Sequence, residues 1–155
     1  MTQLSNADYL RLQIKQELDS HPGIPCALVL LDIDQFHLIN RQHGQHEGDR
    51  VLQAVSHMLL LNLRNEDVLC RYAGDRFALV LHDTSLEEAQ ALAVHLCKMV
   101  RQMRYCAKEA ILEISMRHAC TVADDAPDTL LSRLSRAVEA SALASTEPQL
   151  ATRGL

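Results

Sequence analysis

Acidic side chains stand at the end of a predicted buried strand and in a predicted turn. The run Cys26–Leu31 is apolar throughout, which is typical of a strand buried on both faces, and Asp32-Ile33-Asp34 follows it directly. Because residues i and i+2 of a strand share a face, we expect both carboxylates to point the same way. Together with Asp75 on a neighbouring hairpin, they favour a hard-cation site for Mg²⁺ and phosphates.

The hairpin is predicted over residues 69–81. Two β-prone runs flank a tight turn at Ala73-Gly74, where the glycine permits a positive φ. The turn carries the carboxylate of Asp75 directly beside the cation of Arg76. A hairpin tip of this kind can present its acidic residue to a ligand near the end of a neighbouring strand.

The composition predicts one globular domain. A chain of 155 residues with 48% hydrophobic and 23% charged residues can bury a core without staples. The net charge of −5 argues against a nonspecific nucleic-acid binder, although it permits a local basic pocket for a nucleotide. The five cysteines form no C-x-x-C pattern and are expected as buried thiols in a reducing compartment. No apolar run reaches transmembrane length and no signal peptide is visible, so we expect a cytoplasmic domain without a membrane segment.

Hydrophobic spacing places helices between the strands. Leu10, Ile14 and Leu18 give the first helix one apolar stripe, and a second long helix is expected to open at Asp49 after a turn region. Residues Ile111–Val122 alternate imperfectly and are predicted as one strand. The expected order is α-β-α-α-β-β-α-β-α, which favours an α+β fold. Its mainly antiparallel central sheet would be flanked by helices, in a ferredoxin-like split β-α-β arrangement.

The second half of the chain ends in a predicted helix and a tail. Ser85 and Glu88 fit a capping box that opens the helix after the hairpin. Pro127–Ala142 is predicted as the last helix. We therefore expect a single domain over residues 1–145, with 146–155 as a tail or linker.

In order and spacing, these residues resemble the GGDEF domain family. The resemblance is carried by Leu31-Asp32-Ile33-Asp34-Gln35-Phe36, Asn40, Gly44, Gly48-Asp49 and Arg71-Tyr72-Ala73-Gly74-Asp75-Arg76-Phe77. It extends from about Thr2 to Ala142. Members of that family make cyclic di-GMP from two GTP molecules, or sense nucleotides when their signature is degenerate. The resemblance implies the α+β fold that the residue pattern also favours.

The resemblance implies a Mg²⁺ site. Asp32 matches the first metal-binding carboxylate, and Ile33 would lend its backbone carbonyl to the same ion. Asp75 matches the acidic signature residue, which binds metal and acts as general base in the family. Mg²⁺ would bridge phosphate oxygens there. Strand-end capping is the plainer alternative for Asp32 and Asp34, and we favour the metal role for Asp32 and a structural role for Asp34.

Two further matches concern the base of a bound nucleotide. Asn40 and Asp49 match the residues that recognise guanine in the family. A carboxylate can accept hydrogen bonds from the N1–H and N2–H₂ edge of guanine, and an amide can pair with ring acceptors. The plainer alternatives are a turn asparagine and an aspartate at a helix N-terminus.

The segment Arg64-Asn65-Glu66-Asp67 is an R-x-x-D motif, and five residues separate Asp67 from Ala73. The resemblance implies a product-binding, inhibitory site at Arg64 and Asp67. Arginine can pair bidentately with guanine or phosphate and can stack on a base. A solvated loop or a local ion pair is the plainer alternative.

Several positions depart from the family pattern. The first glycine of the signature is Ala73, its glutamate is Arg76, and the glycine of a later strand motif is Arg117. The family's phosphate-binding lysine after Phe36 is replaced by His37, and the last helix has Ser135, Glu139 and Ala142 in place of Asp, Tyr and Lys. Because cations for the triphosphate are lost, we expect impaired turnover.

The leading hypothesis is a degenerate GGDEF-type domain that binds GTP or cyclic di-GMP as a regulatory module. An active diguanylate cyclase and a structural dimerisation module without nucleotide are the alternatives. Partners would be GTP, cyclic di-GMP, a second copy of the domain, or attached sensor and effector domains, and no nucleic acid. His43 and His46 form an H-x-x-H pair that can bind a transition metal, although surface turn histidines are favoured.

Overall fold

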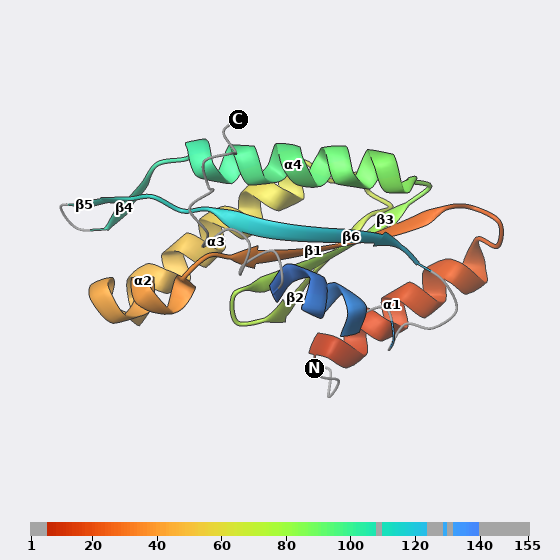
Figure 1. Ribbon diagram of the computed structural model, residues 1–155, viewed down its shortest axis with the longest axis horizontal. Coiled ribbons are helices and arrows are strands. Elements are labelled where there is room, and N and C mark those ends of the chain that lie inside the picture. The colour runs from red at the N-terminus through yellow and green to blue at the C-terminus, as the bar shows by residue number, and fades with distance from the viewer. Residues whose placement is uncertain (1–5, 108–109, 124–128, 130–131, 140–155) are drawn as a thin grey trace.

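A central antiparallel sheet organises the computed structural model, which describes residues 6–107, 110–123, 129 and 132–139 (Figure 1). Within these residues, four strands form the main sheet in the order β2-β3-β1-β6, and a separate hairpin pairs β4 with β5. The elements are α1 (Asn6–Ser20), β1 (Cys26–Ile33), α2 (Phe36–His43), α3 (Gln45–Leu61), β2 (Val68–Ala73), β3 (Arg76–His82), α4 (Leu86–Gln102), β4 (Tyr105–Ala107), β5 (Ala110–Leu112) and β6 (Met116–Val122). Residues 132–139 are helical as well. The predicted α+β fold with a mainly antiparallel sheet is confirmed.

Strand β1 is buried along its whole length, as its continuous apolar run predicts. It lies between β3 and β6, and both pairings are antiparallel. Successive side chains point to opposite faces of the sheet, so Val29 and Leu31 enter one core while Leu28 and Leu30 enter the other. The end of β1, where the acidic residues stand, is therefore held between two neighbouring strands.

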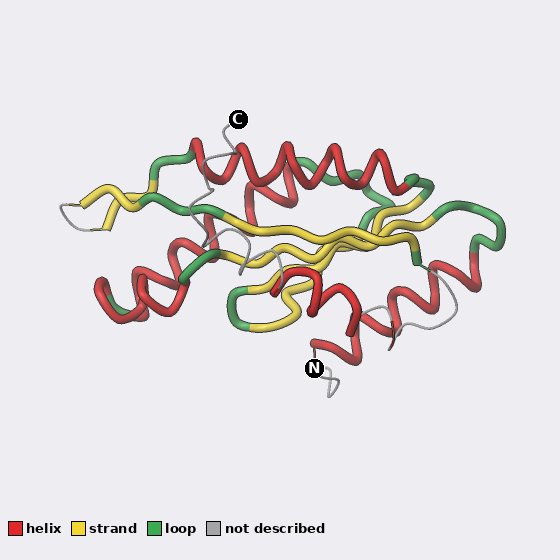
Figure 2. The backbone as a smooth tube through the Cα atoms, in the orientation of Figure 1, coloured by secondary structure: helices red, strands yellow, loops and turns green. Residues whose placement is uncertain are grey.

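Helices cover both faces of the sheet (Figure 2). The core on one face receives side chains from α3 and α4, including Val55 and Leu96. The core on the other face receives Leu10 and Ile14 from α1, together with Leu134 from the helix at 132–139. Figure 1 shows α4 above the sheet, with α1 and this last helix below it. Among the described helices, none is long and apolar enough to cross a membrane.

Two local predictions are confirmed at the residues they named. Leu10 and Ile14 are fully buried, as the apolar stripe of the first helix requires. The capping box is also formed: the backbone N–H of Glu88 donates to Ser85 Oγ at 3.1 Å, and the backbone N–H of Ser85 donates to Glu88 Oε1 at 2.9 Å. Leu130, Leu131 and the predicted tail at 146–155 lie outside the described residues.

The prediction of one strand over Ile111–Val122 is wrong. The segment divides into β5, which pairs with β4, and β6, which pairs with β1. The division follows from the change of partner: at Ser115 the chain leaves the small hairpin, and its carbonyl accepts the backbone N–H of Asp34 at 2.9 Å. The imperfect alternation of the segment reflects this change.

Two boundaries differ from the prediction. Helix α3 begins at Gln45 rather than Asp49, since Gly44, at φ 93°, separates it from α2. The hairpin turn consists of Gly74 and Asp75, one residue later than predicted, because Ala73 still pairs with Arg76. Gly74 does not have the positive φ that the tight turn was expected to need.

Candidate functional site

The carboxylate of Asp32 lies between two arginines that reach it from the neighbouring strands. In the strand register, Asp32 of β1 is directly opposite Arg76 of β3 on one side and Arg117 of β6 on the other. Side chains directly opposite each other in an antiparallel pair share a face and lie close together. The two departures from the family pattern therefore meet at the same acidic residue.

The distances describe a compact ion-pair network. Arg117 Nη2 donates to Asp32 Oδ2 at 2.7 Å, and Arg76 Nε lies 3.5 Å from the same oxygen. Arg117 Nε is 3.0 Å from Asp34 Oδ1, which confirms that Asp32 and Asp34 point the same way. The guanidinium of Arg76 also reaches Glu139 Oε2 at 3.3 Å, on the last described helix.

Asp34 has a structural role, in agreement with the expectation from sequence. Its Oδ2 accepts the hydroxyl of Ser115 at 2.6 Å, and its backbone N–H donates to the carbonyl of Ser115. These bonds fix the chain where it enters β6. They hold Arg117, two residues later, against the carboxylates at the end of β1.

The structure brings Asp32, Ile33 and Asp75 together. The backbone N–H of Ile33 donates to the backbone carbonyl of Asp75 at 3.0 Å, so the hairpin turn is fastened to the end of β1. Asp32 is only 3% exposed, and this burial is the main cause that raises the pKa of its carboxyl. The hydrogen bond from Arg117 acts in the opposite direction, and the nearby charge of Asp75 raises the pKa further.

This arrangement does not fit Mg²⁺ at Asp32. Magnesium requires near-octahedral oxygen ligands and favours carboxylates that are free to face it. Oδ2 of Asp32 is taken by the guanidinium groups of Arg117 and Arg76. The other oxygen, Oδ1, is buried and has no hydrogen-bond partner among the described residues. One free oxygen beside two fixed cations is a poor divalent-metal site.

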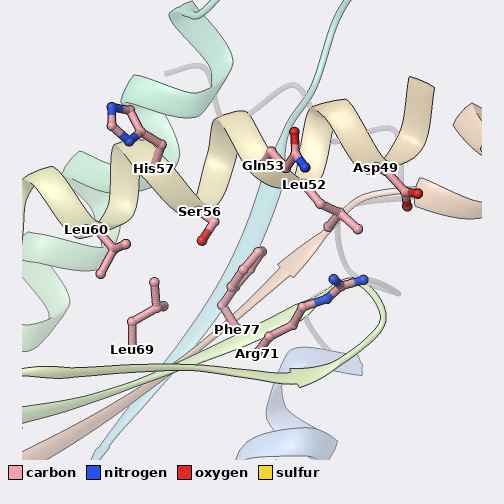
Figure 3. A pocket seen from close by; sticks show the side chains of 9 residues that line it. All are labelled: Asp49, Leu52, Gln53, Ser56, His57, Leu60, Leu69, Arg71 and Phe77. Carbon is pink, nitrogen blue, oxygen red and sulfur yellow. The ribbon is translucent and has the colours of Figure 1, made fainter. Parts of the chain in front are cut away.

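A pocket of about 730 Å³ lies between α3 and the β2–β3 hairpin, in the size range of small-molecule sites. Its lining combines an apolar floor with a few polar groups, and it consists of Asp49, Leu52, Gln53, Ser56, His57, Leu60, Leu69, Arg71 and Phe77. Figure 3 shows Asp49 and Arg71 at the same end of this pocket. Arg71 is held there by its own turn, because its Nε and Nη2 both donate to the carbonyl of Gly74, at 3.1 and 2.9 Å.

The other predicted guanine-binding residue, Asn40, is half-buried next to the pocket helix, with its Oδ1 atom buried. It lies in α2, and its side chain packs against Gly48 of α3, where an added Cβ would overlap its Oδ1. Asn40 therefore contacts the residue that directly precedes Asp49 in α3. Neither plainer alternative holds: Asn40 is in a helix rather than a turn, and Asp49 is in the fifth position of α3 rather than at its cap.

The predicted product-binding pair, Arg64 and Asp67, is joined in one loop. Asp67 accepts the backbone N–H of Arg64 at 2.9 Å and that of His82 at 3.1 Å, and its side chain is 4% exposed. The guanidinium of Arg64 donates to Asp67, to the backbone carbonyl of His82 and to Thr84 Oγ1. It is nevertheless 53% exposed, so one side of it faces solvent. The hydrogen bond that the Arg64 side chain donates to Asp67 is the main cause that raises the pKa of Arg64.

Sequence reasoning did not join Arg117 to the acidic site. In the sequence, Arg117 stands only as a lost glycine, 85 positions from Asp32 along the chain. The signal was present as charge: an arginine in the glycine position and an arginine in the glutamate position, on strands predicted in the same sheet. Glu139, in the tyrosine position, completes the set as a partner for Arg76.

Comparison with known proteins places the chain in a family. The family model described as "Diguanylate cyclase, GGDEF domain" matches residues 1–146. Diguanylate cyclase DosC of Escherichia coli (strain K12) is 31% identical over 106 residues, which cover 67% of this chain and 23% of that protein. Response regulator PleD of Caulobacter vibrioides is 31% identical over 121 residues, which cover 75% and 27%. The chain spans between 9% and 27% of the length of such curated relatives.

Solved structures have the same fold. The diguanylate cyclase SiaD of Pseudomonas aeruginosa, solved in complex with its activator SiaC, aligns with a TM-score of 0.80 at 23% identity, over 88% of this chain and 54% of that one. The GGDEF domain of DgcB from Caulobacter crescentus, solved in complex with c-di-GMP, aligns with a TM-score of 0.79 at 19% identity, over 90% and 81%. At these identities the likeness establishes the fold. Because the family model matches almost the full length of this chain, the chain belongs to the GGDEF domain family of cyclic di-GMP signalling.

Proposed function

We propose that this GGDEF domain is a nucleotide-binding regulatory module that does not turn over GTP. The observation that carries the proposal is the pairing of Asp32 with Arg117 and Arg76, because it places fixed cations against the carboxylate that matches the family's metal ligand. The retained pocket beside Asp49 supports the nucleotide-binding half of the proposal.

Electrostatic magnitudes explain why turnover is expected to be lost. Unit charges about 4 Å apart interact by about 4 kcal/mol at an effective dielectric of about 20, and a divalent ion doubles this repulsion. A single charge-assisted hydrogen bond contributes only about 1.5–3 kcal/mol. The same arithmetic gives a similar attraction between the ion and each ionised carboxylate, so Arg76 and Arg117 offset much of what Asp32 and Asp75 could contribute to holding a divalent ion. Phosphoryl transfer depends on metal ions to neutralise phosphate charge.

The pocket beside α3 can hold a purine base without that metal. Leu52 and Phe77 offer apolar surface, and Asp49 stands at its edge as an acceptor for the guanine N–H groups. An adenine lacks those donors at the matching positions. We therefore expect binding that is weak, since phosphate cations are missing, and selective for GTP over ATP.

An active cyclase is the alternative function, and one observation favours it. Asp32, Ile33 and Asp75 lie together at the end of β1, as the family's catalysis requires. In that case the arginines would have to move away from Asp32 when GTP and metal bind. The two functions differ in whether cyclic di-GMP accumulates from GTP.

Isothermal titration calorimetry with GTP and ATP tests nucleotide binding directly. We expect GTP to bind more tightly than ATP, and Asp49→Ala to weaken GTP binding by about 1.5–3 kcal/mol, or roughly tenfold to a hundredfold. Gln53→Ala is the matched control, because Gln53 lines the same pocket one helical turn from Asp49 and should change selectivity much less. Equal affinity of the unmodified domain for GTP and ATP would contradict the guanine pocket.

A further inference from the structure

A cluster of two histidines and one glutamate lies at the opposite end of β3 from Arg76. Glu17 is in the last turn of α1, His21 follows four residues later, and His82 ends β3. Spacing of i and i+4 puts Glu17 and His21 on one side of the helix end. One ligand atom from each of the three residues lies within 4.8 Å of the other two.

The contacts within the cluster are close. His82 Nδ1 lies 2.6 Å from Glu17 Oε2, and His21 Nδ1 lies 3.4 Å from the same oxygen. The two imidazole rings meet edge to face, with centroids 4.6 Å apart. The Glu17 side chain is 13% exposed and that of His21 is 46% exposed, so the cluster is shielded on one side and open to solvent on the other.

We propose that Glu17, His21 and His82 form a binding site for a transition-metal ion of the Zn²⁺ type. Two imidazoles and one carboxylate are a donor set that suits Zn²⁺, Co²⁺ or Ni²⁺ and does not suit Mg²⁺. Bonds of about 2.0–2.2 Å hold tetrahedral ligand atoms roughly 3.4 Å apart. The His21–Glu17 distance already has this value. His82 and Glu17 need to separate by less than about 1 Å, which side-chain rotation permits.

Hydrogen bonds to the backbone of His82 hold this ligand of the proposed site in place. The N–H of His82 donates to Asp67 at 3.1 Å, and its carbonyl accepts from Arg64 and Thr84. A metal ion would fasten the end of α1 to β3 and leave its fourth position, on the side of half-exposed His21, to water. This inference does not depend on nucleotide binding.

Zinc titration of the tag-free domain in a non-chelating buffer tests the site. We expect one Zn²⁺ per chain by calorimetry, and a rise in the midpoint of thermal unfolding as Zn²⁺ is added, because a ligand that binds only the native state stabilises it. His21→Ala should weaken binding by at least about tenfold and abolish the thermal shift. His21 is half-exposed and outside the core, so this variant is expected to fold.

Glu17→Gln provides a second variant, since the amide keeps the shape of the side chain and loses its charge. It should also lose at least about tenfold in affinity. The matched control is the double variant His43→Ala/His46→Ala, which removes the H-x-x-H pair and should bind Zn²⁺ as the parent does. Co²⁺ in place of Zn²⁺ should give the visible absorption of a tetrahedral site in the parent and in the His43→Ala/His46→Ala control, and not in His21→Ala.

Three results would overturn the proposal. The parent could bind Zn²⁺ with a dissociation constant above about 1 mM, which would mean that the cluster only joins α1 to β3 through hydrogen bonds. His21→Ala could bind as tightly as the parent. The His43→Ala/His46→Ala control could lose the binding, which would place the metal at the other histidine pair.

Discussion

The electrostatics of Asp32 depend on the guanidinium groups at its side. An ionised carboxylate that is 3% exposed has lost most of its hydration, and Arg117 and Arg76 replace part of it. Removing one partner of such a buried pair typically costs about 3–5 kcal/mol, because it leaves an uncompensated charge. The activity of any variant at these arginines should therefore be compared with its free energy of unfolding.

The burial of His118 can be tested at the scale of one residue. It lies on β6, half-buried, with Nδ1 3.7 Å from Cys97 Sγ, and burial lowers its pKa from 6.5. Because the unfolded chain then takes up the proton first, stability is lost as the pH falls through 6.5 towards the lower folded value. Chemical unfolding at about pH 7.5 and about pH 5.5 should show that the parent loses more stability than His118→Gln.

The comparison with His118→Gln cancels the other titrating groups, since both proteins share them. Equal losses of unfolding free energy in the two proteins would mean that His118 is solvated and titrates normally. A larger loss in the variant would contradict the burial of this imidazole on the α4 face of the sheet.

At this scale, sequence reasoning identified the residues of the site better than their contacts. Asp32, Ile33 and Asp75 were predicted to gather, and they do. The ion pair from Arg117 could not be predicted, because it requires the register in which β6 pairs with β1. Asn40 was expected to reach a base, whereas its Oδ1 is buried against Gly48 without a partner among the described residues.

The loop between α3 and β2 is organised independently of the acidic site at Asp32. Asp67 organises it by accepting backbone N–H groups, and Arg64 closes it against Thr84 and His82. The pair uses different side chains from those at Asp32 and lies beyond the opposite end of β3 from Arg76. Loss of turnover need not affect this loop.

We predict that this loop binds cyclic di-GMP through Arg64. The exposed side of its guanidinium can pair with phosphate or guanine and stack on a base. Calorimetry should show that Arg64→Ala loses most of the affinity, and that Arg64→Lys loses a large part of it, because lysine lacks the planar fork. Asp75→Ala should leave the affinity nearly unchanged.

Asn65→Ala is the matched control, since Asn65 is exposed in the same loop. Thermal unfolding of each variant separates loss of a ligand contact from loss of the loop itself. If Arg64→Ala binds cyclic di-GMP as tightly as the parent, the R-x-x-D pair is only a structural ion pair. The domain would then be better explained as an interaction module without this ligand.

Elements with strong local signals were predicted well, and those defined by distant partners were not. The capping box at Ser85 and the buried run of β1 depend on neighbours in sequence, and both are confirmed. The β4–β5 hairpin was missed because its strands have three residues each and little apolar alternation. The predicted start of helix α3 at Asp49 is too late, because Gly48 indicates a turn in the sequence. In the structure, Gly48 lies inside the helix and its missing side chain lets α2 pack closely against it.

At the scale of the whole molecule, the fold keeps the architecture of the family while Arg76 and Arg117 add two cations at one end of the sheet. Arg76, Arg117 and Glu139 reach that end from β3, β6 and the helix at 132–139. The sheet holds them together with Asp32, so three substitutions far apart in sequence act as one network. This network, more than any single altered signature residue, is the basis for expecting no turnover.

Restoring the family residues should show whether the network blocks activity. We expect no cyclic di-GMP from Arg76→Glu alone, because Arg117 still holds Asp32. The double variant Arg76→Glu/Arg117→Gly frees Asp32, yet it still lacks phosphate cations and should recover only weak activity. Lys98→Glu, an exposed charge reversal on α4, is the control for the change in net charge. The thermal unfolding of each variant should be measured alongside its activity.

The most direct test is product analysis after incubation of the unmodified domain with GTP and Mg²⁺, with separation of nucleotides by chromatography. GTP is expected to remain, with no cyclic di-GMP above the level of a protein-free control, while calorimetry on the same preparation detects GTP binding. Steady accumulation of cyclic di-GMP, proportional to the concentration of the domain, would contradict the account. It would mean that Arg117 and Arg76 release Asp32 when the substrate binds.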